Sequence, residues 1–158
     1  MLQSSLKAID MKPQTGMLLK ATAALNDTNF ENAVILITEY NEKGAVGFVV
    51  NKLFSRQLNE LEEFKHSPAF PLYEGGPVDT EHLFFIHQRP DIIQEGKAIG
   101  DDVYYGGNFK QAITAINNKS LTVSGIKIFI GYCGWNAWEL EAEMAEGSWE
   151  PAEEEVFA

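Results

Sequence analysis

Two apolar runs separated by a short polar segment constrain the fold of this 158-residue chain more than any other feature. Residues 33–40 read AVILITEY and residues 45–51 read AVGFVVN, and both runs are rich in β-branched side chains. The polar segment between them ends at Gly44, which can adopt the positive φ angle that closes a hairpin. The first run is almost entirely apolar, as is typical of a strand buried on both faces. We therefore predict a β-hairpin whose first strand lies in the interior.

The apolar residues elsewhere change period several times, and each period predicts a different element. Leu58, Leu61 and Phe64 recur at helical spacing, which predicts a short helix over residues 57–65. Short apolar runs bounded by turn residues predict further strands. These strands are expected at residues 70–74, 83–87, 103–105 and 126–132.

Capping residues mark two further helices. Asn108 followed by Gln111 resembles a capping box and predicts a helix beginning at residue 109. We expect its inward face to carry Phe109, Ala112, Ile113 and Ile116. Asn136 as N-cap, Glu139 in the first turn and Gly147 beyond the end delimit the last helix. We expect its apolar face to carry Leu140 and Met144.

The predicted strands outnumber the helices and cluster as hairpins, which indicates an α+β fold with a mixed sheet. A length of 158 residues is close to that of one average domain, and the chain contains no internal repeat or flexible linker. We expect one domain over residues 1–158, with a core at about 16–149 and an acidic tail at 150–158.

The charge of the chain limits the kinds of partner that it can bind. The sequence has 23 acidic and 12 basic residues, a formal net charge of −11, and only two arginines, Arg56 and Arg89. Proteins bind duplex DNA largely by placing Lys and Arg on phosphates, so direct nucleic-acid binding is disfavoured. Eight glutamates lie in the last twenty residues, and we expect residues 150–158 to form a solvated tail that aids solubility.

The apolar segments and the single cysteine indicate a cytoplasmic protein. No apolar run approaches the ~18 residues needed to span a bilayer, and residues 1–12 lack the apolar segment of a signal peptide. Cys133 has no second cysteine with which to form an intrachain disulfide. We expect no membrane association and no cofactor.

Motifs of known chemistry are absent from the sequence. It contains no nucleotide-binding glycine loop, zinc-protease motif or nucleophile elbow. His82 and His87 are five residues apart, a spacing that does not converge on one metal on either a strand or a helix, so no metal site is predicted. His87 at a strand end is either a general base or a structural hydrogen-bonding group. Cys133 is either a reactive thiol or a small buried side chain.

The paired glycines Gly75 and Gly76, which precede a proline, are the most pointed local feature. They allow a close backbone approach either to a ligand with anionic groups or to a neighbouring strand. Trp135, in the glycine-containing segment 131–135, permits the same two interpretations. No catalytic residue is assigned. The candidate ligand-binding residues are Asp27, Asn51, Gly75, Gly76, His87 and Trp135.

An ordered set of short motifs resembles the AlgH/YqgE family of bacterial proteins over about residues 16–149. These motifs lie at residues 16–19, 25–30, 44–52, 75–78, 83–87, 131–135, 140–143 and 147–149. The resemblance implies an α+β domain with a bifurcated mixed sheet around a small closed barrel, flanked by helices. It implies no known reaction, because the family carries the label of transcriptional regulator without a shared biochemical mechanism.

Two hypotheses for the function follow. The first is a non-enzymatic regulatory or binding module that acts through a protein partner or a small ligand. The alternative is an enzyme acting on a small substrate, with a cleft formed by Asn51, Gly75, Gly76 and His87 and with Asp27 nearby. The strand edges and the tryptophans near the last helix are also compatible with a homodimer.

Overall fold

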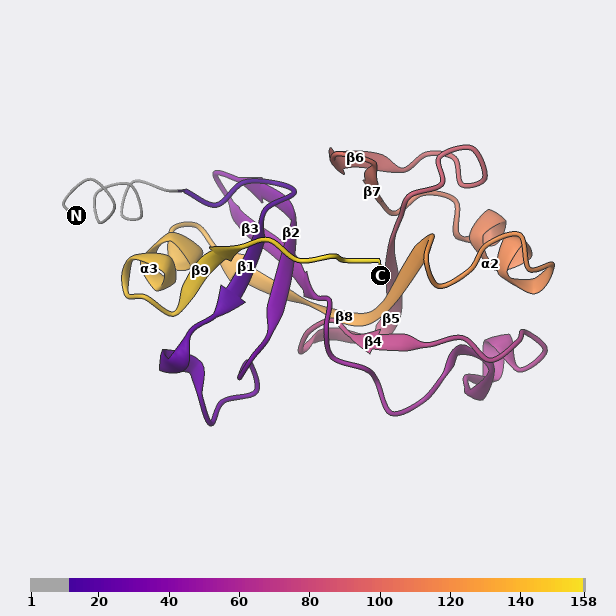
Figure 1. Ribbon diagram of the computed structural model, residues 1–158, viewed down its shortest axis with the longest axis horizontal. Helices are drawn as coiled ribbons and strands as arrows, with labels where there is room; N and C mark the ends of the chain where they lie inside the picture. Colours follow the sequence, from indigo (N-terminus) through magenta and orange to yellow (C-terminus); the bar gives the residue numbers. More distant parts are fainter. Residues whose placement is uncertain (1–11, 158) are drawn as a thin grey trace.

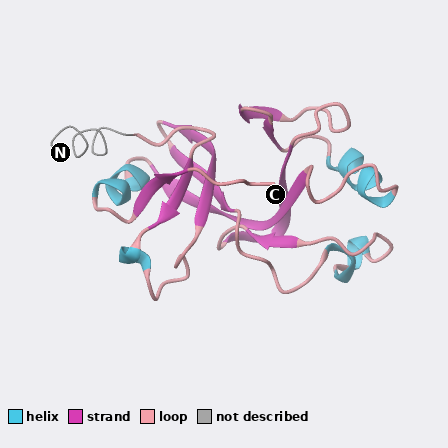
Figure 2. Cartoon of the chain, viewed as in Figure 1, coloured by secondary structure: helices cyan, strands magenta, loops and turns pink. Residues whose placement is uncertain are grey.

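The computed structural model describes residues 12–157, which form a nine-stranded mixed sheet with two α-helices (Figures 1 and 2). The strand order is β6-β7-β5-β8-β3-β2-β1-β9, and β4 pairs with β8 outside this path. The strands are β1 (Leu18–Ala21), β2 (Val34–Asn41), β3 (Gly44–Val49), β4 (Leu72–Glu74), β5 (Val78–His87), β6 (Lys97–Gly100), β7 (Val103–Tyr105), β8 (Ile126–Asn136) and β9 (Trp149–Ala152). The helices are α2 (Phe109–Asn117) and α3 (Glu139–Ala145).

The predicted hairpin is confirmed as strands β2 and β3. The turn closes at Gly44, whose φ of +140° is accessible to glycine, and Asn41 pairs with Gly44 across the turn. The first five residues of β2 are all buried, as the continuous apolar run predicts. The hairpin therefore supplies the middle of one half of the sheet.

Strand β8 belongs to both halves of the sheet. Its first part lies between parallel β4 and antiparallel β5, while its second part pairs with β3. Between these parts Gly131 has a φ of +71°, which bends the strand. The single parallel pair makes the sheet mixed, and the change of partners along β8 divides it into two diverging halves (Figure 1).

The predicted closed barrel is wrong. In the described residues β6 and β9 stand at opposite ends of the strand order and do not pair with each other. Because β8 changes partners at its bend, the two halves turn away from each other, and the sheet stays open.

The helix predicted for residues 57–65 is also wrong in type. The segment forms two 3₁₀ turns, Leu58–Glu60 and Glu62–Phe64, with Leu61 extended between them. The extended backbone of Leu61 interrupts the helix, and the N–H of Leu58 bonds to the carbonyl of Phe70, just before β4. The sequence analysis missed β1, β6 and β9, which are short strands of four residues each.

Both α-helices occur where their capping residues predict them, except that α3 begins later than expected. The side chain of Asn108 accepts the backbone N–H of Gln111 at 3.0 Å, as expected of an N-cap. Helix α3 begins after Trp138 rather than Asn136, because Asn136 is the last residue of β8 and pairs with Gly44. At its end Gly147 has a φ of +85°, and the backbone bonds of residues 147 and 148 to carbonyls of α3 form a Schellman motif.

The C-terminal segment, residues 149–157, crosses the face of the sheet, and we call it the strap. It is only in part the solvated tail that its charge predicts, because both of its ends pack against the rest of the fold. Its first residues form β9, which pairs with β1, and near its end Phe157 is buried in a cluster that includes Leu36 and Ile99. Glu153, Glu154 and Glu155 between these anchors are exposed. No helix in residues 12–157 is long and apolar enough to cross a membrane.

The buried face of α3 permits a test of this packing. Leu140 is fully buried against the hairpin half of the sheet, so Leu140→Ala is expected to cost about 2–5 kcal/mol of unfolding free energy in urea denaturation. Leu53→Ala is the matched control, because Leu53 is 65% exposed and its truncation removes little packing. Equal midpoints for the two variants would contradict the placement of α3.

Candidate functional site

Three of the predicted site residues lie together where the chain crosses β8. The carbonyl of Gly75 accepts the N–H of Val49 at 2.8 Å, and the N–H of Gly75 bonds to Ile130 at 2.9 Å. The side chain of Asn51 accepts the N–H of Val34 and donates to the carbonyl of Asn32, both at 2.9 Å. These bonds occupy the polar groups of Asn51 and the N–H of Gly75 with backbone partners.

The paired glycines are needed for a close approach to strand β8. A Cβ atom on Gly76 would lie 2.1 Å from the carbonyl carbon of Tyr132, and one on Gly75 would lie 2.5 Å from the Gly131 oxygen. Contacts this short with backbone atoms cannot be relieved by moving a side chain. Of the two interpretations left open, the neighbouring strand accounts for this approach.

His87 lies apart from these glycines. It pairs with Ile126 of β8, whereas Gly75 bonds to Ile130, so the two are separated by four residues, roughly 13 Å, along the strand. The His87 ring is fully buried; Nε2 lies 3.1 Å from the Gly106 carbonyl, and Nδ1 accepts the Arg89 N–H at 3.1 Å. Burial lowers the pKa of His87 below its ordinary value. A neutral ring with both nitrogens engaged serves the structure rather than proton transfer.

Asp27 and Trp135 lie in other parts of the fold. Asp27 is an exposed loop residue with a φ of +67°, and its N–H bonds to the side chain of Glu31. Trp135 pairs with Ala45 at the far end of β8, and its indole N–H donates to Glu143 at 3.1 Å. The carboxylate of Glu143 also accepts the indole N–H of Trp149 at 2.9 Å. The six candidates therefore do not converge on one cleft.

Cys133 is a buried side chain of β8, in agreement with one of the two interpretations left open. It is 3% exposed, and its thiol donates to the carbonyl of Gly75 at 3.4 Å. Burial, with a smaller contribution from Glu143, raises the pKa of the thiol to about 12. The nucleophilic thiolate is therefore scarce at neutral pH.

Lys127 is a buried cation that the sequence analysis missed. Its ammonium group donates to the carbonyl of Val50 at 2.9 Å and lies 4.3 Å from the centroid of the Tyr73 ring. Burial lowers the pKa of Lys127 from 10.5 to about 8. The lone lysine in the apolar run 126–130 is the signal that could have identified it. The accepting carbonyl lies in the segment that connects β3 to β4, where it has no strand partner.

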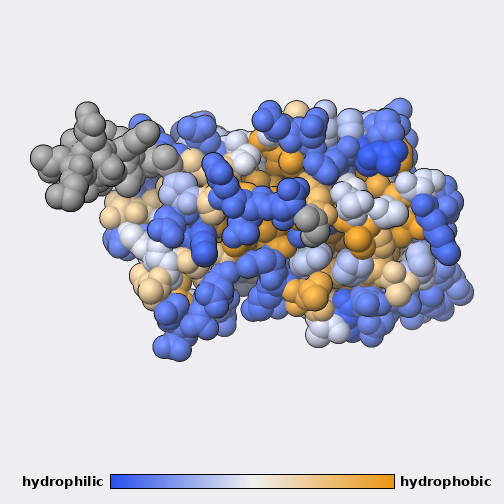
Figure 3. Space-filling view, in the orientation of Figure 1, coloured by the Kyte–Doolittle hydropathy of each residue, from blue (hydrophilic) through white to orange (hydrophobic). Residues whose placement is uncertain are grey.

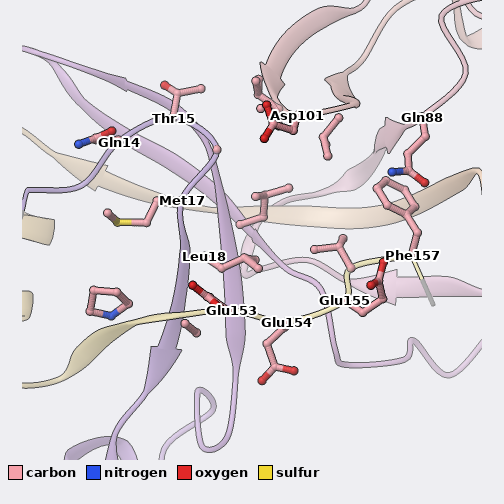
Figure 4. Close-up of a pocket in the computed structure, with 18 residues that line it drawn as sticks. Gln14, Thr15, Met17, Leu18, Gln88, Asp101, Glu153, Glu154, Glu155 and Phe157 are labelled. Carbon is pink, nitrogen blue, oxygen red and sulfur yellow. The ribbon is translucent and has the colours of Figure 1, made fainter.

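A hollow lies beneath the strap, and we call it the strap cavity. It has a volume of about 900 Å³ and lies between β1 and β2 of one sheet half and β6 and β7 of the other, as Figure 4 shows. Gly16 and Ile99 meet beside it, where a Cβ on Gly16 would lie 2.0 Å from the Ile99 oxygen. Figure 3 shows hydrophobic surface on both sides of the hydrophilic strap.

The lining of the strap cavity comes from five separate parts of the sequence. Residues 14–18, Leu36, residues 99–101 and Val103 contribute walls, Gln88 contributes an amide, and residues 151–157 form the cover. No local pattern connects these segments, which explains why the sequence analysis did not find the cavity. The one indication is that the apolar pair Val156 and Phe157 ends an otherwise acidic segment.

The glycine crossing yields a stability prediction. Gly76→Ala places a methyl group against the Tyr132 backbone, and the resulting overpacking is expected to cost about 1–3 kcal/mol or more of unfolding free energy. Gly134→Ala is the control, because the nearest atom to a Cβ there is a side-chain carbon of Tyr132 at 3.4 Å. Urea denaturation of both variants checks this, and a Gly76→Ala variant as stable as Gly134→Ala would be inconsistent with the crossing.

The lowered pKa of Lys127 yields a pH prediction. The pKa of Lys127 is 10.5 in the unfolded state and about 8 in the folded state. Between these two pH values the unfolded state binds more protons than the folded state. The free energy of unfolding therefore rises as the pH increases through this window and falls again as the pH is lowered. Lys127→Met removes the titration while keeping an unbranched side chain. The difference in unfolding free energy, wild type minus variant, should rise from pH 8 to pH 10.5. A constant difference would show that the ammonium group is not buried.

Comparisons with known proteins agree on one family. The profile of the AlgH-like family matches residues 18–156. A UPF0301 protein from Chlorobaculum tepidum is 37% identical over 150 residues, covering 93% of this chain and 79% of that protein. The solution structure of the AlgH protein from Pseudomonas aeruginosa has a TM-score of 0.71 and 28% identity, covering 93% of this chain and 85% of that one. A crystal structure of a Corynebacterium diphtheriae protein has the same fold, with a TM-score of 0.72, 22% identity, and 94% and 81% coverage. As the sequence motifs indicate, the chain belongs to the AlgH-like family.

Proposed function

We propose that this protein is a non-catalytic binding module with a regulatory role, and that it acts by holding a small ligand in the strap cavity. The cavity of about 900 Å³ is the observation that carries the proposal. Ligand sites in proteins commonly have volumes of 300–1,000 Å³ and combine apolar walls with a few polar groups. The strap cavity meets this description, with Leu18, Ile99 and Val103 on its walls and Gln88 at its side.

The chemistry of the reactive side chains supports binding rather than catalysis. His87 has both ring nitrogens engaged, and the Cys133 thiol is buried with a raised pKa. Neither residue lines the strap cavity. A general base has to reach the proton that it removes, and these groups are occupied within the fold.

The charge of the molecule supports a ligand other than nucleic acid. The net charge is −11, and the strap that covers the cavity carries three successive glutamates, Glu153, Glu154 and Glu155. Phosphate groups would be repelled by this surface. A regulatory role would therefore pass through the bound ligand rather than through direct contact with DNA.

A fragment screen by ¹⁵N–¹H NMR tests the proposal. We expect fragments that bind to shift the amide signals of Leu18, Ile99 and Phe157 together, because these residues surround one cavity. Val103→Trp should abolish these shifts, since the larger ring fills space beside Ile99. Val123→Trp is the matched control and should leave them unchanged, because Val123 is 55% exposed and does not line the cavity.

Two results would contradict the proposed function. One is a screen in which fragments shift amides elsewhere and none around the cavity. The other is a Val103→Trp variant that binds the same fragments as the wild type while keeping the wild-type spectrum.

A further inference from the structure

The walls of the strap cavity form an aliphatic surface. Leu18 and Leu36 line it from one half of the sheet, and Ile99 and Val103 line it from the other. All four belong to, or pack against, the hydrophobic cluster that Phe157 completes. An apolar group placed here would leave water without opening the core, since the cavity already exists.

The rim of the same cavity is acidic. Asp101 stands on the turn between β6 and β7, and Glu153, Glu154 and Glu155 stand on the strap. None of these four carboxylates forms an ion pair within residues 12–157. The lining of the cavity contains no lysine, arginine or histidine. The cavity therefore has a negative charge that no side chain of its described lining offsets.

The carboxylates face the cavity from two sides. In Figure 4 Asp101 and the strap lie on opposite sides, with Leu18 between them, and the side chains of Glu153 and Glu155 are directed to the cavity side of the strap. The side chain of Glu154 is directed away from it. A ligand lying on Leu18 would thus meet carboxylates above and below an apolar surface.

We propose that the strap cavity binds an organic cation with an apolar body, meaning an alkyl or aryl group that carries an amine or a guanidine. This inference rests on the proposed function and names its ligand class. The apolar body would lie on Leu18, Ile99 and Val103, and the cationic group would lie at the acidic rim, attracted by the charges of Asp101 and Glu155. The rim carboxylates are exposed to solvent, so their attraction for a cation is moderate and is screened by salt.

Other ligand classes fit the same surface less well. An anion or a fatty acid would be repelled by the four carboxylates. A divalent metal needs several converging oxygen ligands, and the described residues contain no group of three acidic, histidine or cysteine side chains placed to hold one. A neutral apolar molecule would contact the apolar walls but would leave the carboxylates of the rim without a partner.

Titration with three probes of equal chain length tests the ligand class. Octylammonium, octanol and octanoate are added separately to the full chain at pH 7, and calorimetry gives each dissociation constant while NMR locates the site. We expect octylammonium to bind most tightly, octanol more weakly and octanoate most weakly. Raising the salt concentration should weaken octylammonium and leave octanol nearly unchanged.

Charge-removing variants test whether the rim carboxylates are responsible. Asp101→Asn and Glu155→Gln should each weaken octylammonium by about fivefold and leave octanol unchanged. Glu154→Gln is the matched control, since it removes the same charge from a side chain directed away from the cavity, and should change binding by less than about twofold. The side chains at positions 101, 154 and 155 are exposed to solvent, so each substitution is expected to leave the thermal unfolding temperature unchanged.

The outcomes separate this inference from the proposed function. Octanoate or octanol bound at the cavity as tightly as octylammonium would overturn the ligand class and leave the binding module standing. Octylammonium binding that Glu154→Gln weakens as much as Asp101→Asn would reflect net charge alone and would also overturn the class. If none of the probes binds, the class is overturned, and the fragment screen alone decides the proposed function.

Discussion

The close backbone packing of Gly75 and Gly76 against strand β8 is the contact on which the rest of the structure depends. Because of this packing, β4 runs parallel to the first part of β8. The chain then turns back and forms β5 on the other side of β8. No residue with a Cβ fits at Gly76, because the Tyr132 backbone is only 2.1 Å from the position of that atom. With β4 and β5 on either side, β8 bends at Gly131 and pairs with β3 beyond the bend.

This bend creates the space beneath the strap in which we propose that a ligand binds. Because the two halves of the sheet diverge, the end strands β6 and β9 cannot meet, and the sheet stays open. The strap spans the gap, anchored by β9 at one end and by Phe157 at the other. The exposed glutamates between the anchors give the cavity its acidic rim. The bend in β8 thus accounts both for the open sheet and for the strap cavity.

The polar groups that attract attention in the sequence are mainly occupied in holding this fold. The amide oxygen of Asn51 accepts a backbone N–H and its amide nitrogen donates to a backbone carbonyl, while His87 bonds to two backbone groups. Lys127, which the sequence analysis missed, likewise donates to the carbonyl of Val50. Each lies where a strand ends or the chain crosses the sheet, and there backbone groups lack a strand partner. Side chains that look functional in sequence can therefore be structural, while the cavity is lined by residues without a motif.

The sequence by itself determined the elements whose signals are local. The turn at Gly44, the cap at Asn108 and the helix end at Gly147 each depend on residues within a few positions, so these elements were predicted correctly. The tertiary structure alone decided the short strands β1, β6 and β9, the two 3₁₀ turns in place of a helix, the open sheet and the strap cavity. Each of these three strands has a charged residue or a proline among its four residues, which breaks the apolar pattern. They exist because distant segments supply their hydrogen-bond partners. The cavity likewise exists only where residues 14–18, 99–103 and 151–157 meet.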